Sequence, residues 1–216
     1  MKYYIKLILY LYVLIQYSVS FSGSYDDFFR ALIRDDAVLV SNLLKRGFDP
    51  NTPGPDGQAG LLHALRQPSF KVIDELLAWP NLKVEVRTAA DESALMLAAM
   101  KGYGSVCKKL IDRDADVNKP GWTPLHYAAT GGHADIVLML LEHHAYIDAA
   151  SPNGTTPLMM AAMYGSARIV KILLEAGADP VLKNDANLTA LHFATLAERS
   201  DSAEIIGTFV RALSPK

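Results

Sequence analysis

Residues 121–148 read GWTPLHYAATGGHADIVLMLLEHHAYID, and this stretch predicts two short helices joined by a tight turn. Thr123 can cap the free N–H groups of the first helix, and Pro124 fits its first position. Gly131 and Gly132 end that helix. A second helix is predicted by apolar residues that recur at i, i+1, i+4 and i+5, namely Ile136, Val137, Leu140 and Leu141. Each helix is too short to bury its own apolar face, so the hairpin needs neighbours of the same kind.

The same hairpin recurs along the chain at a nearly constant spacing. TPLMMAAMYGSARIVKILLEAGADP begins at Thr156, 33 residues after Thr123, and TALHFATLAE begins another 33 residues on, at Thr189. Upstream, SALMLAAMKGYGSVCKKLIDRDADVN begins at Ser93. A period near 33 with T-P-L-H-x-A resembles the ankyrin-repeat family. The resemblance covers nearly all of residues 24–216 and implies an all-α solenoid of stacked helix–turn–helix repeats with short β-turn fingers.

About six repeats can be laid out, and the outermost ones are expected to be atypical because one side of each faces water. In the second repeat Ala59 and Gly60 replace the Thr and Pro of the motif, so its first helix should start less firmly. The entry turn of the fourth repeat, 118–121, is shorter than the family norm, so its finger should be stunted. The expected boundaries are 24–52, 53–86, 87–120, 121–148, 149–181 and 182–216.

Four positions where the repeat calls for glycine hold other residues. Asp91, Asp114, His144 and Asn187 occupy these turn positions, which need a left-handed backbone. Asn, Asp and His tolerate that conformation better than most residues. We therefore expect positive φ angles at all four.

The first 22 residues differ in kind from the repeats. Lys2 and Lys6 give a basic start, an apolar run follows over 7–15, and small residues alternate from Ser18 to Ser22. This order is typical of a secretory signal peptide. The apolar run is short for a membrane span, which takes about 20 residues, yet apolar residues continue to position 21. We expect residues 1–22 to be a cleaved signal and residues 23–216 to be the repeat domain, with an uncleaved membrane anchor as the alternative.

The sequence contains no recognisable motif for catalysis, cofactor binding or metal binding. Phosphate-binding loops, dinucleotide-binding loops, G-x-S-x-G and H-E-x-x-H are all missing. Cys107 is the single cysteine and falls on an apolar helix face, which predicts a small buried side chain. His126 and His192 occupy the fourth position of T-P-L-H, where the resemblance implies hydrogen bonds between neighbouring loops. We expect no enzyme, no cofactor and no metal site, although a hydrolase or metal enzyme in an unusual repeat stays an alternative.

What remains is a surface for binding another protein. In the ankyrin architecture the finger tips and first helices form a concave face, and its exposed positions lie before T-P-L-H and after A-A. Several of these positions hold large apolar side chains where water is otherwise expected, and such side chains are enriched in interfaces. The alternative is that Trp122 only shields the short turn. The predicted partner-binding residues are Met100, Lys101, Trp122, Asn153, Met163, Tyr164 and Leu188.

These patterns favour an interaction scaffold that displays a concave face in the periplasm or outside the cell, resembling exported bacterial ankyrin proteins. Its partner would be an unidentified protein, with no small-molecule substrate. A net charge of −2 gives no general attraction to nucleic acid or to anionic membranes, so membrane contact would occur only through an uncleaved N-terminal segment. Two alternatives remain open, a secreted effector that binds a host protein and a membrane-anchored ankyrin protein.

Overall fold

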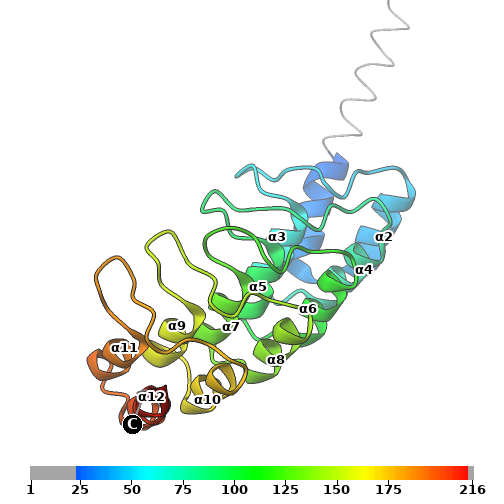
Figure 1. The fold of residues 1–216 in the computed structure, drawn as a ribbon. Coiled ribbons are helices and arrows are strands. Elements are labelled where there is room, and N and C mark those ends of the chain that lie inside the picture. Colours follow the sequence, from blue (N-terminus) through cyan, green and yellow to red (C-terminus); the bar gives the residue numbers. More distant parts are fainter. Residues whose placement is uncertain (1–22, 214–216) are drawn as a thin grey trace, which may run out of the picture. The chain divides into compact units, whose positions relative to one another are not determined.

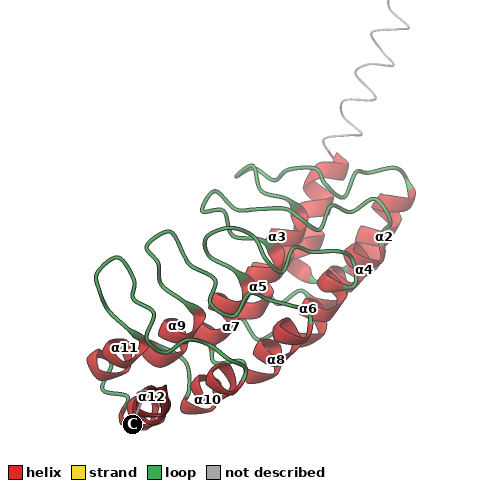
Figure 2. Ribbon diagram, in the orientation of Figure 1, coloured by secondary structure: helices red, strands yellow, loops and turns green. Residues whose placement is uncertain are grey.

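The computed structural model describes residues 23–213, so residues 1–22, where we predict an export signal, lie outside it. Within the described residues the helices form six consecutive pairs joined by loops (Figures 1 and 2). The described residues divide into two compact parts, one up to Lys83 and one from Val84 onward. The helices are 23–34, α2 (Ala37–Lys45), α3 (Gly60–Arg66), α4 (Phe70–Ala78), α5 (Ala94–Met100), α6 (Gly104–Ile111), α7 (Pro124–Gly131), α8 (Ala134–Glu142), α9 (Pro157–Met163), α10 (Ala167–Glu175), α11 (Ala190–Leu196) and α12 (Ser200–Leu213).

This architecture is the all-helical one that the repeat pattern predicts. Within 23–213 the only β pairing consists of isolated antiparallel bridges, such as the one between Pro53 and Ala59 at the base of a finger. Over the same residues, no helix is both long enough and apolar enough to cross a membrane.

The first part contains the helix over 23–34 together with α2, α3 and α4. Its two helix pairs are joined by polar bonds as well as by apolar packing, since the buried Ser69 hydroxyl donates to the Leu32 carbonyl at 2.6 Å. The Val72 N–H donates to the Asp35 carboxylate at 2.9 Å. Helix α3 begins after Ala59 without a side-chain cap, which is the weak start that the missing Thr and Pro predict.

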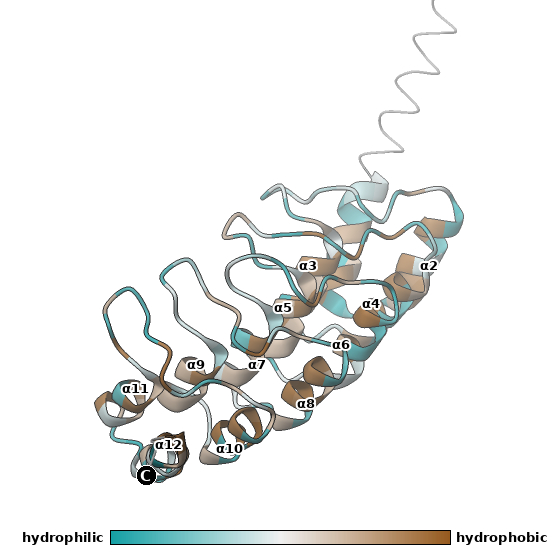
Figure 3. Ribbon diagram, viewed as in Figure 1, coloured by the Kyte–Doolittle hydropathy of each residue, from teal (hydrophilic) through white to brown (hydrophobic). Residues whose placement is uncertain are grey.

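In the second part, the first helix of each repeat packs against the first helix of the next, and second helices pack against second helices. The first helices α5, α7, α9 and α11 contact one another in chain order, and the second helices α6, α8, α10 and α12 form another row beside them (Figure 1). Leu125, Ala128 and Ala129 are fully buried on α7, as are Ile136, Val137 and Leu140 on α8. The apolar residues therefore concentrate on the helices, while the loop tips are largely polar (Figure 3).

Alanine and glycine let the first helices approach closely. A Cβ added at Gly165, just after α9, would lie 2.6 Å from the carbonyl oxygen of Ala129 in the previous repeat and 2.9 Å from that of Ala161. Real side chains do not make such contacts, so the stacking distance between α7 and α9 depends on glycine at this position.

The predicted caps and turns are present. The Thr123 hydroxyl accepts from the His126 N–H, and the Thr156 hydroxyl accepts from the Met159 N–H at 3.3 Å. The predicted left-handed positions all have positive φ, which is 61° at Asp91, 61° at Asp114, 62° at His144 and 59° at Asn187. The sequence reading missed two further left-handed residues, Asp35 and Glu198.

Polar side chains also join successive repeats on the loop side of the second helices. Asn118 donates through its amide to the His144 carbonyl at 2.8 Å and accepts from the Tyr146 N–H at 2.7 Å. In the next repeat Asp148 accepts from the Asp179 N–H at 3.2 Å. In the first part Asn51 makes the same pair of bonds to the chain around residues 81–83. Each bond joins one repeat to its immediate successor.

Candidate functional site

The fingers that precede the first helices place the candidate site. Most of them close as small hairpins: before α9, the Ser151 N–H donates to the Thr155 carbonyl at 3.0 Å. The finger before α5 closes in the same way between Thr88 and Glu92, at 2.9 Å. These hairpins extend from the same side of the second part (Figure 2). The turn over 118–121, before α7, shows no such closing pair among the backbone hydrogen bonds of residues 23–213, which fits the predicted short finger.

A buried lysine takes the place of the missing hairpin. Lys119 is only 5% exposed, and its ammonium donates to the carbonyls of Pro120 at 3.0 Å and Trp122 at 3.4 Å. The same ammonium pairs with the Asp91 carboxylate of the previous finger at 2.6 Å. The hydrogen bond from Lys119 is the main cause that lowers the pKa of Asp91 below its ordinary value. Lys119 thus fixes the backbone just before α7, including the backbone of Trp122.

Trp122 borders a surface hollow of about 260 Å³, which we call the Trp122 hollow. Its walls come from the finger before α5 and from α5, α7 and α9. Met100 is 39% exposed, and the Trp122 ring meets the His126 ring edge to face with centroids 5.2 Å apart. The lining residues are Glu92, Met100, Trp122, His126, Tyr127, Thr130 and Met160.

One of the lining residues, Glu92, carries a carboxylate. The Tyr127 hydroxyl donates to Glu92 Oε1 at 3.0 Å, and the Thr88 hydroxyl donates to Glu92 Oε2 at 3.1 Å. Desolvation, followed by the bond to Glu92, raises the pKa of Tyr127, so the phenol stays protonated and keeps donating. Both of these donors are neutral, so they orient the carboxylate without compensating its charge.

His126 lines the hollow and has a structural role. Its Nδ1 accepts from the Thr123 N–H at 3.2 Å, so the ring proton lies on Nε2, which donates to the Thr155 carbonyl of the next repeat at 2.9 Å. The residue is fully buried, and this desolvation lowers its pKa to about 4. His126 is therefore a neutral link between loops at pH 7, which is the role that the resemblance implies.

The structure brings only some of the predicted partner-binding residues together. Met100 and Trp122 line the same hollow. Met163 and the 52% exposed Tyr164 lie at the end of α9, one turn beyond Met160, and Lys101 is the exposed residue after α5.

The other two predicted residues lie elsewhere in the second part. Asn153 is at the tip of the next finger, where its side chain accepts from the Ser151 hydroxyl at 2.6 Å. Leu188 lines a separate hollow of about 360 Å³ with Leu191, His192, Thr195 and Leu196.

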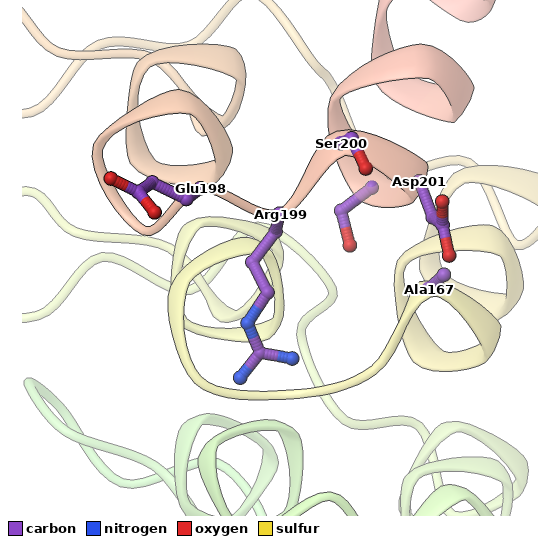
Figure 4. A pocket seen from close by; sticks show the side chains of 6 residues that line it. Ala167, Glu198, Arg199, Ser200 and Asp201 are labelled. Atoms are coloured by element: carbon purple, nitrogen blue, oxygen red, sulfur yellow. The ribbon is translucent and has the colours of Figure 1, made fainter.

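A third hollow, at the start of α12, is polar. Figure 4 shows the Arg199 side chain among the residues that line it. The Arg199 guanidinium donates to two carbonyls of the previous repeat, that of Gly165 at 2.9 Å and that of Tyr164 at 3.4 Å. Asp201 and Glu198 add carboxylates to the lining of this hollow, and Ser200 and Ala167 also line it. His133 makes the matching contact two repeats earlier, to the Met100 carbonyl at 3.1 Å. Arg199 is thus a structural bridge.

Of the residues that line the Trp122 hollow, the predicted partner-binding set contains only Met100 and Trp122, and it leaves out Glu92, Thr130, Tyr127 and Met160. Tyr127 and Met160 share one position of the repeat. Both stand at the variable position after the fourth letter of T-P-L-H-x-A, and they are 33 residues apart. The structure shows that this position lies beside the positions before Thr and after A-A. The sequence did contain a signal for these two residues, because a large side chain, tyrosine or methionine, occupies the same variable position in two successive repeats.

The remaining reactive groups are buried or tied to local structure. Burial raises the pKa of the Cys107 thiol to about 12, so it is the inert core side chain that its position predicts. In the first part His63 meets Asp56 at 2.9 Å within a finger. Over residues 23–213, no cluster of His, Cys, Asp and Glu has an arrangement that could hold a metal ion.

Comparison with known proteins supports the repeat assignment. Residues 28–120, 61–151 and 147–208 match the family model described as ankyrin repeats (3 copies). The chain is 31% identical over 151 residues to human BCL-6 corepressor-like protein 1, covering 68% of this chain and 8% of that protein. It is 34% identical over 98 residues to the Notch-regulated ankyrin repeat-containing protein of Xenopus tropicalis, covering 43% of this chain and 86% of that protein.

A solved structure is also similar. It is the complex of Bd0816, a predatory endopeptidase from Bdellovibrio bacteriovorus, with immunity protein Bd3460. The match has a TM-score of 0.73 and 26% sequence identity, and it covers 84% of this chain and 97% of the matched chain.

Proposed function

Because the chain belongs to the ankyrin-repeat family, we propose that it is a non-enzymatic scaffold that binds a partner protein through the Trp122 hollow and the exposed end of α9. Ankyrin repeats are protein-binding modules, and the solved complex contains a similar chain together with a protein partner. The match covers only 8% of human BCL-6 corepressor-like protein 1, so we do not assign the overall activity of that protein to this chain.

One observation carries the choice of surface. Trp122, Met100 and Met160 border one hollow at the protein surface, instead of being packed inside. Tyr164 extends the apolar surface on α9. Tryptophan, tyrosine and methionine are enriched at interface centres, where a few such anchors supply most of the binding energy.

The test compares two double variants in partner capture. Trp122→Ala with Tyr164→Ala should abolish capture of a protein that the wild type retains, with an unchanged circular dichroism spectrum. A matched control is Tyr146→Ala with Leu138→Ala, which removes exposed side chains (67% and 42% exposed) on the second-helix side. The captured protein is identified by mass spectrometry and then titrated in purified form. Equal binding by the wild type and the Trp122/Tyr164 variant would reject this surface.

We further propose that the protein is exported, as its N-terminal sequence predicts. Fractionation and N-terminal sequencing of the mature protein test this proposal. A start near residue 21 or 23 in a periplasmic fraction agrees with cleavage, and a start at Met1 in membranes indicates an anchor. Recovery from culture medium or from a host cell favours the effector alternative.

The likeness to an immunity protein in complex adds a candidate class of partner, an endopeptidase. If the captured protein is an endopeptidase, an equimolar amount of this chain should reduce its peptidase activity. The Trp122/Tyr164 double variant should leave that activity unchanged. If an endopeptidase binds but keeps its full activity, the scaffold role stands and the inhibitory role is rejected.

A further inference from the structure

We propose that the Trp122 hollow receives an arginine side chain of the partner protein, with Glu92 as the carboxylate and Trp122 as the aromatic surface that the guanidinium contacts. This inference rests on the proposed function, and it names the chemistry by which the surface selects its partner. It follows from the charge in the hollow, the apolar walls around it and the atoms that remain open on the carboxylate.

The negative charge of Glu92 disfavours apolar and acidic side chains as occupants of the hollow. Glu92 lines the hollow, and its two hydroxyl donors leave its negative charge in place. A partner that covered the hollow with an apolar side chain would take this charge out of water without compensation, which is unfavourable in an apolar setting. An acidic side chain would add repulsion. A cationic side chain compensates the charge as it enters.

The walls favour a cation that is planar and weakly hydrated. Trp122, Tyr127, Met100 and Met160 line the same hollow as Glu92 and give it aromatic and thioether surface. Guanidinium groups stack on aromatic faces and lose water more readily than ammonium groups do. The bond from Tyr127 to Glu92 also holds the phenol ring beside the carboxylate.

The open atoms match a guanidinium fork. Each oxygen of Glu92 accepts one hydrogen bond, so each keeps another acceptor site. Two parallel N–H groups of arginine can use both sites in a fixed, planar fork, whereas an ammonium group presents its donors without that geometry. Lys119, the nearby buried cation, donates to Asp91 and to backbone carbonyls, and the structure records no bond from it to Glu92 within residues 23–213.

A titration with small probes tests the hollow without the partner. N-acetyl-arginine amide is added to the full chain, and the side-chain indole signal of Trp122 is followed by NMR. The chain has two tryptophans, so Trp79 serves as the internal reference. The matched probe is N-acetyl-citrulline amide, which is nearly isosteric and uncharged, and N-acetyl-lysine amide tests the preference for a planar cation.

We expect a saturable shift of the Trp122 signal with arginine amide, about tenfold weaker binding of citrulline amide, and intermediate binding of lysine amide. Glu92→Gln should remove the preference for arginine over citrulline. Glu142→Gln removes the same charge from an exposed position at the end of α8 and should keep the preference.

In the titration, three results would overturn the inference: no saturable shift, equal binding of arginine and citrulline amides, or an undiminished preference in Glu92→Gln. The outcome is separable from that of the proposed function. If arginine amide binds as expected but no protein is captured, the scaffold role fails and the cation site stands. If the Trp122/Tyr164 variant loses its partner while Glu92→Gln keeps full affinity, the surface stands and the arginine pocket fails.

Discussion

Lowering the pH from 7 to 4 should destabilise this protein in part through one side chain, His126. In the folded chain burial lowers the pKa of His126 to about 4, whereas in the unfolded chain it should lie near 6.5. The unfolded chain therefore takes up a proton over this interval while the folded chain does not. The stabilisation is complete above about pH 6.5 and is lost progressively as the pH falls towards 4.

The size of the effect follows from the two pKa values. At 1.36 kcal/mol for each pH unit between about 6.5 and about 4, the free energy of unfolding should decrease by roughly 3 kcal/mol. The carboxylates also titrate near pH 4, so the wild type alone cannot isolate this share. His126→Gln keeps an N–H for the Thr155 carbonyl and does not titrate. The difference in unfolding free energy between the two proteins should therefore shrink by roughly 3 kcal/mol from pH 7 to pH 4.

Urea unfolding at several pH values, followed by circular dichroism, measures this difference. NMR titration of the His126 ring checks the pKa directly. A difference that stays constant from pH 7 to pH 4, or a ring that titrates near pH 6.5 in the folded protein, would refute the assignment of a neutral, buried link.

Three further predictions concern packing and reactivity. Leu140→Ala, at a fully buried site, should lower the free energy of unfolding by about 2–5 kcal/mol, whereas Leu138→Ala, at a 42% exposed site, should stay within about 1 kcal/mol in the same urea series. Gly165→Ala should destabilise by about 1–3 kcal/mol because the new Cβ would meet backbone at 2.6 Å, while Gly207→Ala within α12 should be neutral or stabilising; a stable Gly165→Ala protein would show that the repeats can separate there. Cys107, whose pKa burial raises to about 12, should react with Ellman's reagent far more slowly in the folded protein than in urea, and equal rates would contradict its burial.

The repeat pattern was enough to predict the helix pairs, the caps at Thr123 and Thr156 and the left-handed turn at His144, because these depend on residues close together in sequence. The Trp122 hollow could be predicted only in part. Glu92 and Tyr127 are brought together by the stacking of two repeats, and a single sequence does not show which side chains will bond across that contact.

Lys119 shows the same limit more sharply. A lysine in a polar turn suggests a solvated surface residue, since burying an ammonium group is unfavourable unless it is paired. The structure supplies the pairing through Asp91 and two backbone carbonyls, and the need for it arises from the short finger. The sequence predicted that the finger is short but not what would replace it.

The bonds from Asn118 and Asp148 have a consequence for how such a chain can change length. Each of them connects a repeat only to the one that follows, through a side-chain oxygen that accepts a backbone N–H of the next repeat. A duplication or loss of one whole block of about 33 residues would recreate an existing junction, whereas a partial block would leave these side chains facing the wrong backbone. We therefore expect natural variants of this protein to gain or lose complete repeats between the two ends.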